Sequence, residues 1–387
     1  MTEGKATAHR FFALALPLAL SLSWFARAVR AADSPTFTRD GEDLTRRFPG
    51  ATVDRLEGGA YAVTPPPFAL PESVEDLRYH WRFSCAAYVF LPRSEGPMRG
   101  LFRVVVLRYQ PEYRDQARRC ACLIARLLLL HRNHFHRETT FPDQAEGADV
   151  FLAAEKPPGG SHLGGETWKN SVYVFGVGVE KRSALEWVRT VAHEWGHLTL
   201  PAARRFREPE NDAAGYLGER LYLKWLRSGE PGRPAGEPDD GTTVADLDLY
   251  YHRQINPLIE EYQNAGPGSS LLDGADTAAM DYYIGAVLAT DNAFGSTVTG
   301  RALYNVLADR AREFLVALRK DVVESPKVAV TLPAWIPVRQ GTYMVTSGKR
   351  ASSDSLLRVG KTEWRFLRCE PGTSETILLT RAGASAP

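Results

Sequence analysis

One segment, residues 183–200, limits most strongly what this chain can fold into. It reads SALEWVRTVAHEWGHLTL and stands directly before Pro201. Ser183 followed three residues later by Glu186 is the capping-box pattern that begins a helix, and a proline ends one. The sequence therefore predicts a helix over residues 183–200 that carries two histidines in its second half.

Those histidines, His193 and His197, are four residues apart. Residues at this spacing lie on one face of a helix, so both imidazoles can bind one metal ion. Glu194, next to the first histidine, can take a proton from a zinc-bound water and deliver it to a leaving amine. The segment matches the HExxH pattern of zinc peptidases and predicts a Zn²⁺ site.

A catalytic zinc site needs a third protein ligand and one open position. A third histidine at the extended spacing is excluded, because Leu200 and Ala203 stand where that pattern needs glycine and histidine. The ligand is then a carboxylate further along the chain. The acidic residues available there are Glu208, Glu210, Asp212 and Glu219.

Glu219 is the expected third ligand because of its place on a second predicted helix, residues 212–227. A carboxylate on an apolar helix face is costly unless it is paired or bound to metal. Gly215 and Gly218 would let this helix approach the histidine helix closely. We expect Arg220, Lys224 and Arg227 to face solvent, Glu208 and Glu210 to lie in the connecting loop, and Asp212 to cap the helix.

The segment VRTVAHEWGH, followed by a glutamate on the next helix, resembles the zincin metallopeptidases, and their gluzincin branch in particular. The resemblance covers residues 111–320 in layout. It implies a helix, a mixed sheet with an edge strand, the HExxH helix, a ligand helix and a helical lower lobe. It also implies that His193, His197 and Glu219 bind zinc, that Glu194 is the general base, and that residues 167–177 bind an extended peptide.

One residue departs from that family. Gluzincins often carry an aspartate four residues after the ligand glutamate, where it orients a zinc histidine, and this chain has Leu223 there. Support for the histidines must then come from elsewhere. The resemblance also implies a tyrosine or histidine that stabilises the oxyanion, and the sequence leaves five candidates open: Tyr250, Tyr251, His252, Tyr282 and Tyr283.

The fold class we expect is α+β, in four parts. Residues 1–31 form a signal peptide, residues 32–110 a β-rich region, residues 111–325 the zincin-like domain, and residues 326–387 a small separate β domain. Helical patterns cover residues 111–131, 244–264, 275–290 and 297–323. Strand patterns cover 149–154 and 167–177, and short strand patterns recur after Pro326.

The first 31 residues point to export. A basic start precedes a short apolar run, residues 11–25, which small residues follow. This is a secretory signal pattern, and it predicts a secreted or periplasmic protein. Cleavage after Ala28, Ala31 or Ala32 stays open, as does an uncleaved anchor. The sequence leaves it open whether Cys85, Cys120, Cys122 and Cys369 form disulfides.

Composition narrows the partners. The 387 residues carry a formal net charge of +1, with 44% hydrophobic residues. This charge gives no basic surface for nucleic acid, and no segment after the signal is apolar enough to span a membrane. The expected partner is a peptide or protein substrate, and the oligomeric state is open. Two alternatives to an active peptidase remain: a binding protein on the same scaffold, and a zinc hydrolase of non-peptide amides.

Overall fold

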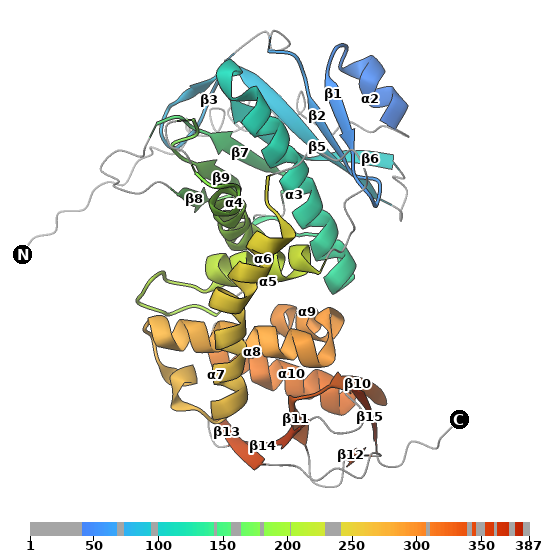
Figure 1. The fold of residues 1–387 in the computed structure, drawn as a ribbon, viewed down its shortest axis with the longest axis vertical. Helices are drawn as coiled ribbons and strands as arrows, with labels where there is room; N and C mark the ends of the chain where they lie inside the picture. The colour runs from blue at the N-terminus through green and yellow to red at the C-terminus, as the bar shows by residue number, and fades with distance from the viewer. Residues whose placement is uncertain are drawn as a thin grey trace, which may run out of the picture.

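The structure is a computed structural model. It describes residues 41–67, 73–93, 100–142, 145–155, 164–178, 182–201, 203–228, 241–306, 310–338, 343–345, 353–359, 362–370 and 376–381. The predicted signal segment, residues 1–31, lies outside the described residues, so export stays a prediction. The described part is a mixed α+β fold, as we expected for the class (Figure 1).

A seven-stranded sheet forms the upper half of the described structure (Figure 1). Two of its pairings, β6 with β7 and β7 with β9, are parallel, and the others are antiparallel, so the sheet is mixed. In spatial order its strands are β1 (Thr52–Arg55), β2 (Tyr61–Thr64), β5 (Cys85–Arg93), β6 (Gly100–Tyr109), β7 (Ala148–Leu152), β9 (Ser171–Val174) and β8 (Gly165–Trp168).

Helices α3 (Arg114–Phe135) and α4 (Ala184–Thr199) cover one face of this sheet. Alternation along the strands explains why: in β9, Val172 and Val174 join the main core with the helices, whereas Tyr173 joins a separate aromatic cluster on the other face. The hairpin of β3 (Val74–Glu75) and β4 (Arg82–Phe83) packs into that cluster. Helix α2 (Gly41–Arg47) buries Leu44 in a third, smaller cluster.

The next helix, α5 (Ala214–Arg227), touches α4 backbone to backbone. A Cβ atom added at Gly218 would stand 2.4 Å from the Cα atom of Gly196, and one at Gly196 would stand 2.5 Å from the carbonyl oxygen of Ala214. Only glycine allows two helices to come this close. The close approach expected from the glycines of α5 is confirmed, and Gly196 of the HExxH segment is its other half.

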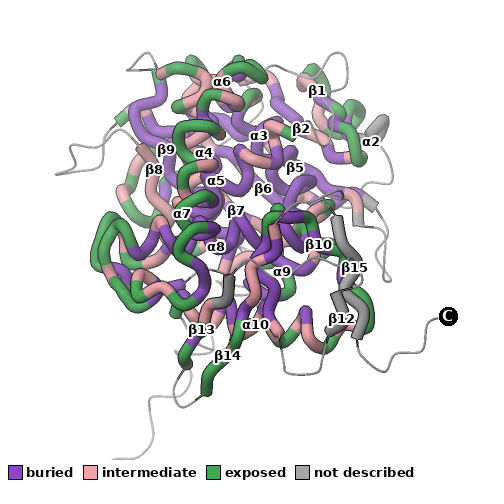
Figure 2. The backbone as a smooth tube through the Cα atoms, turned by 60° about the horizontal axis from the view of Figure 1, so that its bottom comes forward, coloured by how far each residue is buried: buried purple, intermediate pink, exposed green. Residues whose placement is uncertain are grey.

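The lower half of the described structure is mainly helical, and buried residues run from α3 and the central strands into α8 (Figure 2). A π-helical turn, η3 (Tyr251–Ile255), joins α6 to α7, so the helical pattern over 244–264 is continuous. The segment 297–323, expected as one helix, is two. The helices of the lower half are α6 (Val244–Tyr250), α7 (Asn256–Ala265), η4 (Ser270–Asp273), α8 (Thr277–Phe294), α9 (Ser296–Tyr304) and α10 (Ala311–Glu324).

Strands follow α10, as predicted, and they form two three-stranded sheets. The first has the order β10 (Lys327–Thr331), β15 (Thr376–Arg381), β12 (Tyr343–Val345). The second has the order β11 (Ala334–Val338), β14 (Thr362–Cys369), β13 (Ser353–Val359).

The expected domain boundaries do not match the packing at either end. Strands β1, β2, β5 and β6 belong to the same sheet as β7, so residue 110 is not the edge of a separate region. Trp335 and Phe366 of the C-terminal strands are buried in the main core, and the Trp335 indole donates to the Gln263 carbonyl of α7. The described part of the C-terminal strands therefore shares the main core.

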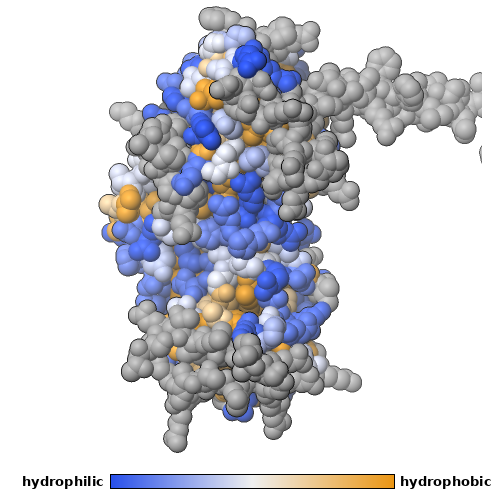
Figure 3. Space-filling view, turned by 90° about the vertical axis from the view of Figure 1, so that its right-hand side faces the viewer, coloured by the Kyte–Doolittle hydropathy of each residue, from blue (hydrophilic) through white to orange (hydrophobic). Residues whose placement is uncertain are grey.

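The surface seen from one side is polar across its middle, where hydrophilic side chains dominate the described atoms (Figure 3). Among the described residues, no helix has the length and apolar character that crossing a membrane requires.

Candidate metal centre

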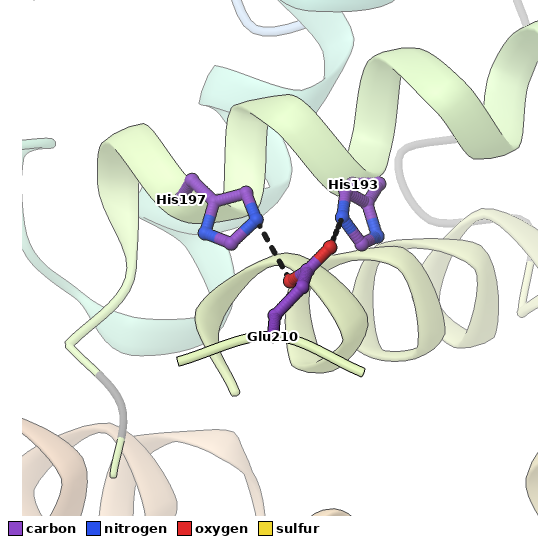
Figure 4. Close-up of side chains that lie close together, drawn as sticks. All are labelled: His193, His197 and Glu210. Atoms are coloured by element: carbon purple, nitrogen blue, oxygen red, sulfur yellow. Dashed lines mark hydrogen bonds and ion pairs between the residues drawn. The ribbon is translucent and has the colours of Figure 1, made fainter. Parts of the chain in front are cut away.

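The two histidines of α4 point their Nε2 atoms at one carboxylate, that of Glu210 (Figure 4). Nε2 of His193 lies 2.8 Å from Oε1 of Glu210, and Nε2 of His197 lies 3.0 Å from Oε2. One ligand atom from each residue can be chosen so that all three lie within 4.8 Å of one another. The four-residue spacing thus places both histidines on one helix face, as the sequence predicted, and Glu210 contacts both of them.

Helix α4 is built as the sequence indicated. The Ser183 hydroxyl accepts from the backbone N–H of Glu186, and the Glu186 carboxylate accepts from the backbone N–H of Ser183. This reciprocal cap fixes where the helix begins, and the fixed start sets which face carries the histidines.

Glu210 comes from a folded-back loop between α4 and α5. The loop is closed by an isolated antiparallel bridge between Arg204 and Asp212, and the backbone N–H of Arg205 donates to the Asn211 carbonyl at 2.9 Å. These bonds hold Glu210 against the histidines. We expected a connecting loop here, but no residue pattern indicates that the loop turns the Glu210 side chain toward the histidines.

The Nδ1 atoms of the histidines face two other carboxylates. Asp212 Oδ1 lies 3.4 Å from Nδ1 of His197, and Glu219 Oε2 lies 3.6 Å from Nδ1 of His193. Asp212 also accepts from the backbone N–H of Ala214, the first residue of α5, but the N-cap position belongs to Ala213, so the cap expected at Asp212 lies one residue off. Carboxylates on this side of a metal-binding histidine orient the ring and strengthen its donor nitrogen.

Glu219 therefore does not lie where we expected the third ligand. Its Oε1 accepts from Nε of Arg189 at 2.6 Å and from the Tyr250 hydroxyl at 2.7 Å. The α5 residue Gly215, one helical turn earlier, lies against the two Nε2 atoms, and it has no side chain. The expected face of α5 does lie toward the histidines, but Glu219 on that face approaches Nδ1 of His193 rather than Nε2.

We also expected Arg220, Lys224 and Arg227 to face solvent, and two of them do not. Arg220 is only 8% exposed and faces Asp281 of α8, and Lys224 pairs with the buried Asp291 of the same helix. The third residue, Arg227, lies nearer the surface, where it pairs with Asp248. A helix over residues 275–290 was expected, but the sequence does not indicate that this helix, α8, packs over Arg220 and Lys224.

Glu194, the neighbour of His193 in the chain, points toward the edge strand β8. It is buried, and its Oε2 accepts from the hydroxyl of Thr167 at 2.9 Å. A Cβ atom at Gly165 would stand 2.3 Å from Cγ of Glu194, so the glycine leaves room for the carboxylate. Burial raises the pKa of Glu194, although the two histidines and Thr167 oppose that rise.

The centre is strongly acidic around its histidines. Burial lowers the pKa of His193, but Glu210 and Glu219 outweigh burial and raise that pKa to about 9. Asp212 and Glu210 likewise outweigh burial and raise the pKa of His197 to about 10. Burial raises the pKa of Glu210, and the two histidines bring it down to about 2. The surrounding carboxylates thus favour positive charge at the histidines.

The residues present fit a zinc ion. Two imidazole nitrogens and one carboxylate form a donor set that zinc accepts, and carboxylates stand behind both rings. Space is kept by Gly215, where an added Cβ atom would stand 2.3 Å from Nε2 of His197 and 2.6 Å from Nε2 of His193. Any larger residue would fill the place between the two donor nitrogens.

Among the described residues, the five aromatic candidates for oxyanion contact form no direct hydrogen bond or ring contact with His193, His197 or Glu210. Tyr250 donates to Glu219, Tyr282 donates to the Gly266 carbonyl, and Tyr283 is buried against Phe314. Tyr251 packs against Arg227, and His252 is exposed. The aromatic residue beside the centre is Tyr216, whose ring meets His193 edge-on at 4.7 Å between centroids. Sequence reasoning missed it because Tyr216 lies outside the apolar face of α5.

The four cysteines, Cys85, Cys120, Cys122 and Cys369, are all buried. Among the described residues, Cys85, Cys120 and Cys122 are free thiols, so none of the possible disulfides between these three is present.

The sequence was compared with protein-family models and with curated proteins. No protein-family model matches the sequence, and a search of curated proteins returns no significant match.

Proposed function

We propose that this protein is a zinc-dependent peptidase, with Glu210 as the carboxylate ligand, and that its fold is zincin-like. The observation that carries the proposal is the convergence of His193, His197 and Glu210, with the buried Glu194 beside them. Catalytic zinc sites use three protein ligands of these types and keep one position open. The HExxH pattern on a capped helix supports the same function.

In this proposal His193, His197 and Glu210 hold the zinc ion. Bound zinc would lower the pKa of water and polarise a substrate carbonyl group. Glu194 takes a proton from the attacking water and delivers it to the leaving amine, which returns Glu194 to its ionised form. Thr167 holds Oε2 of Glu194, so Oε1, on the Gly165 side, is the oxygen that carries the proton.

The neighbouring strand favours a peptide substrate. Strand β8 is at the edge of the sheet, and both Gly165 and Thr167 of this strand contact Glu194. An edge strand presents unpaired backbone N–H and C=O groups that an extended peptide can pair with. A peptide bound there would lie along the strand that holds the base.

Metal analysis and a single substitution test the proposal. We expect about one zinc per chain in the purified protein and hydrolysis of a mixed peptide substrate. Glu194→Gln should keep the zinc and lower turnover by roughly 100-fold or more, because an amide cannot accept the proton. Glu208→Gln, an exposed loop change, should alter neither. A protein that binds no zinc after reconstitution, or a Glu194→Gln variant with full activity, would overturn the proposal.

A further inference from the structure

Arg220 is a buried guanidinium group with incomplete partners. Its side chain is 10% exposed, and its nearest carboxylate, Asp281, lies 3.8 Å away, at the outer limit of an ion pair. Nη1 donates to the Tyr216 carbonyl at a long 3.3 Å, and Nε has no hydrogen-bond partner among the described residues. A buried arginine is normally satisfied by a two-pronged carboxylate contact. Arg220 lacks one.

The rest of the chain shows what such a contact looks like. Arg118 places Nε and Nη2 at 2.8 Å and 2.6 Å from the two oxygens of Asp54. Arg301 does the same with Asp321, at 2.7 Å and 2.8 Å. Against these pairs, the single 3.8 Å approach of Asp281 leaves the fork of Arg220 open.

Asp281 is itself poorly stabilised. Burial raises the pKa of this carboxyl, and the charge of Arg220 offsets the rise only in part. A strong ion pair would hold the pKa of Asp281 below its usual range instead. The pair is therefore weak enough for another carboxylate to compete with it.

Arg220 is also close to the metal centre. Its guanidinium carbon lies 4.9 Å from the centre of the Tyr216 ring, and that ring meets His193 at 4.7 Å. One aromatic ring thus separates Arg220 from a histidine of the centre. The side chains of Tyr216 and Asp281 are both partly exposed, so the group can be approached from their side.

We propose that Arg220 binds a carboxylate of the peptide substrate close to the bond that is cleaved, and so makes the enzyme selective for acidic substrates. The carboxylate is either the peptide's C-terminus or the side chain of an aspartate or glutamate. It displaces Asp281 and forms the two-pronged contact that the fold leaves open. This inference rests on the proposed peptidase function.

The test measures binding separately from catalysis. Zinc-loaded Glu194→Gln protein is titrated with two matched peptide pairs by calorimetry. One pair is acetyl-trialanine as the free acid and as the amide. The other is acetyl-Ala-Glu-Ala-amide and acetyl-Ala-Gln-Ala-amide. We expect one acidic member to bind about 10- to 100-fold more tightly than its neutral partner, and the pair that responds identifies the source of the carboxylate.

Three further changes assign that preference to Arg220. Arg220→Gln should abolish it, and Arg220→Lys should reduce it, because a lysine keeps the charge but loses the fork. Asp281→Asn should increase it by removing the competing carboxylate. The control is Arg227→Gln on the same helix, whose side chain already pairs with Asp248 at 2.5 Å, and it should leave the preference unchanged.

The outcomes separate the two proposals. Equal binding of the acidic and neutral members in both pairs, or no binding of any probe, overturns the role of Arg220 even if wild-type protein cleaves peptides. A clear acid preference that Asp281→Asn does not increase also overturns it, and this variant keeps Arg220 in place should its replacement prevent folding. If wild-type protein cleaves nothing while the preference stands, the peptidase function fails and the carboxylate site remains.

Discussion

The hydroxyl of Thr167 lies 2.9 Å from Oε2 of Glu194 and equally 2.9 Å from the backbone carbonyl oxygen of the same residue. One side chain on the edge strand thus fixes both the carboxylate and the helix turn that carries it. The sheet edge and the proposed base cannot move apart without breaking this contact. The position of Glu194 is therefore set by β8 as well as by α4.

Replacing Thr167 with valine should lower peptide turnover by roughly 10-fold or more, since a hydrogen bond to a charged group contributes about 1.5–3 kcal/mol. Zinc content should stay at one per chain, because Thr167 touches no residue that would hold the metal. Thr167→Ser, which keeps the hydroxyl, serves as the control and should retain most activity. Full turnover in the valine variant would show that this contact does not position the base.

Glu210→Gln should weaken zinc binding more than any other single acidic substitution at the centre. Glu219→Gln and Asp212→Asn should each weaken it by about 10- to 100-fold, the loss typical of residues that orient a ligand. Competition with a chelator of known affinity gives the four constants, with Glu208→Gln as the variant that should match wild type. If Glu219→Gln lost more zinc affinity than Glu210→Gln, the ligand assignment made here would be wrong.

Gly215→Ala should affect zinc binding and Gly218→Ala should affect stability, although both add one methyl group to α5. At Gly215 the atoms nearest the methyl are the ends of two imidazoles, so we expect zinc binding to fail while the metal-free protein keeps its melting temperature. At Gly218 the methyl meets the backbone of α4, which cannot yield, so the melting temperature should fall, by about 1 °C for each kcal/mol lost, since the unfolding entropy grows by about 2.1 cal/mol/K per residue. Thermal melts of both variants with and without zinc distinguish the two effects.

His131 should make stability depend on pH. It is fully buried between the hydroxyls of Tyr222 and Tyr304, and burial lowers its pKa from 6.5 to about 3. Between those values the unfolded chain binds a proton that the folded chain does not, so acidification favours unfolding.

We therefore expect the free energy of unfolding of metal-free protein to fall between pH 6 and pH 4, by about 1.4 kcal/mol per pH unit from this group. His131→Gln should lack that component, and urea titrations at several pH values measure it. His252→Gln, a change at an exposed histidine, should follow the wild-type slope. Parallel slopes for wild type and His131→Gln would contradict the assignment.

Local signals in the sequence predicted the helices well and the loops poorly. The cap at Ser183 and the stop at Pro201 bracket α4, and the helix that follows ends at Arg227 as expected. The segment 167–177 was expected to be one strand, but it begins inside a hairpin, because Lys169 adopts a positive φ of 53° and turns the chain between β8 and β9. A lysine seldom adopts a positive φ, so its presence does not predict such a turn.

The third ligand shows the same limit in the candidate site. Helical periodicity can rank the faces of α5, and it selected the face toward the histidines. It cannot show that a loop folds back over that face, because the bridge between Arg204 and Asp212 depends on backbone conformation rather than on any residue pattern. Glu210 and Tyr216 could be found only once the elements were placed in space.

The contact between Gly196 and Gly218 has a consequence for how this sequence can change over time. The contact joins backbone to backbone, so no side chain at the crossing of α4 and α5 is available to be trimmed, enlarged or repacked. Substitutions elsewhere in the core can accumulate and alter the outer packing of both helices, while the spacing between the histidines and α5 stays anchored at this crossing. A lineage that retains these two glycines can drift far from its ancestors in sequence and still keep the same distance across the centre.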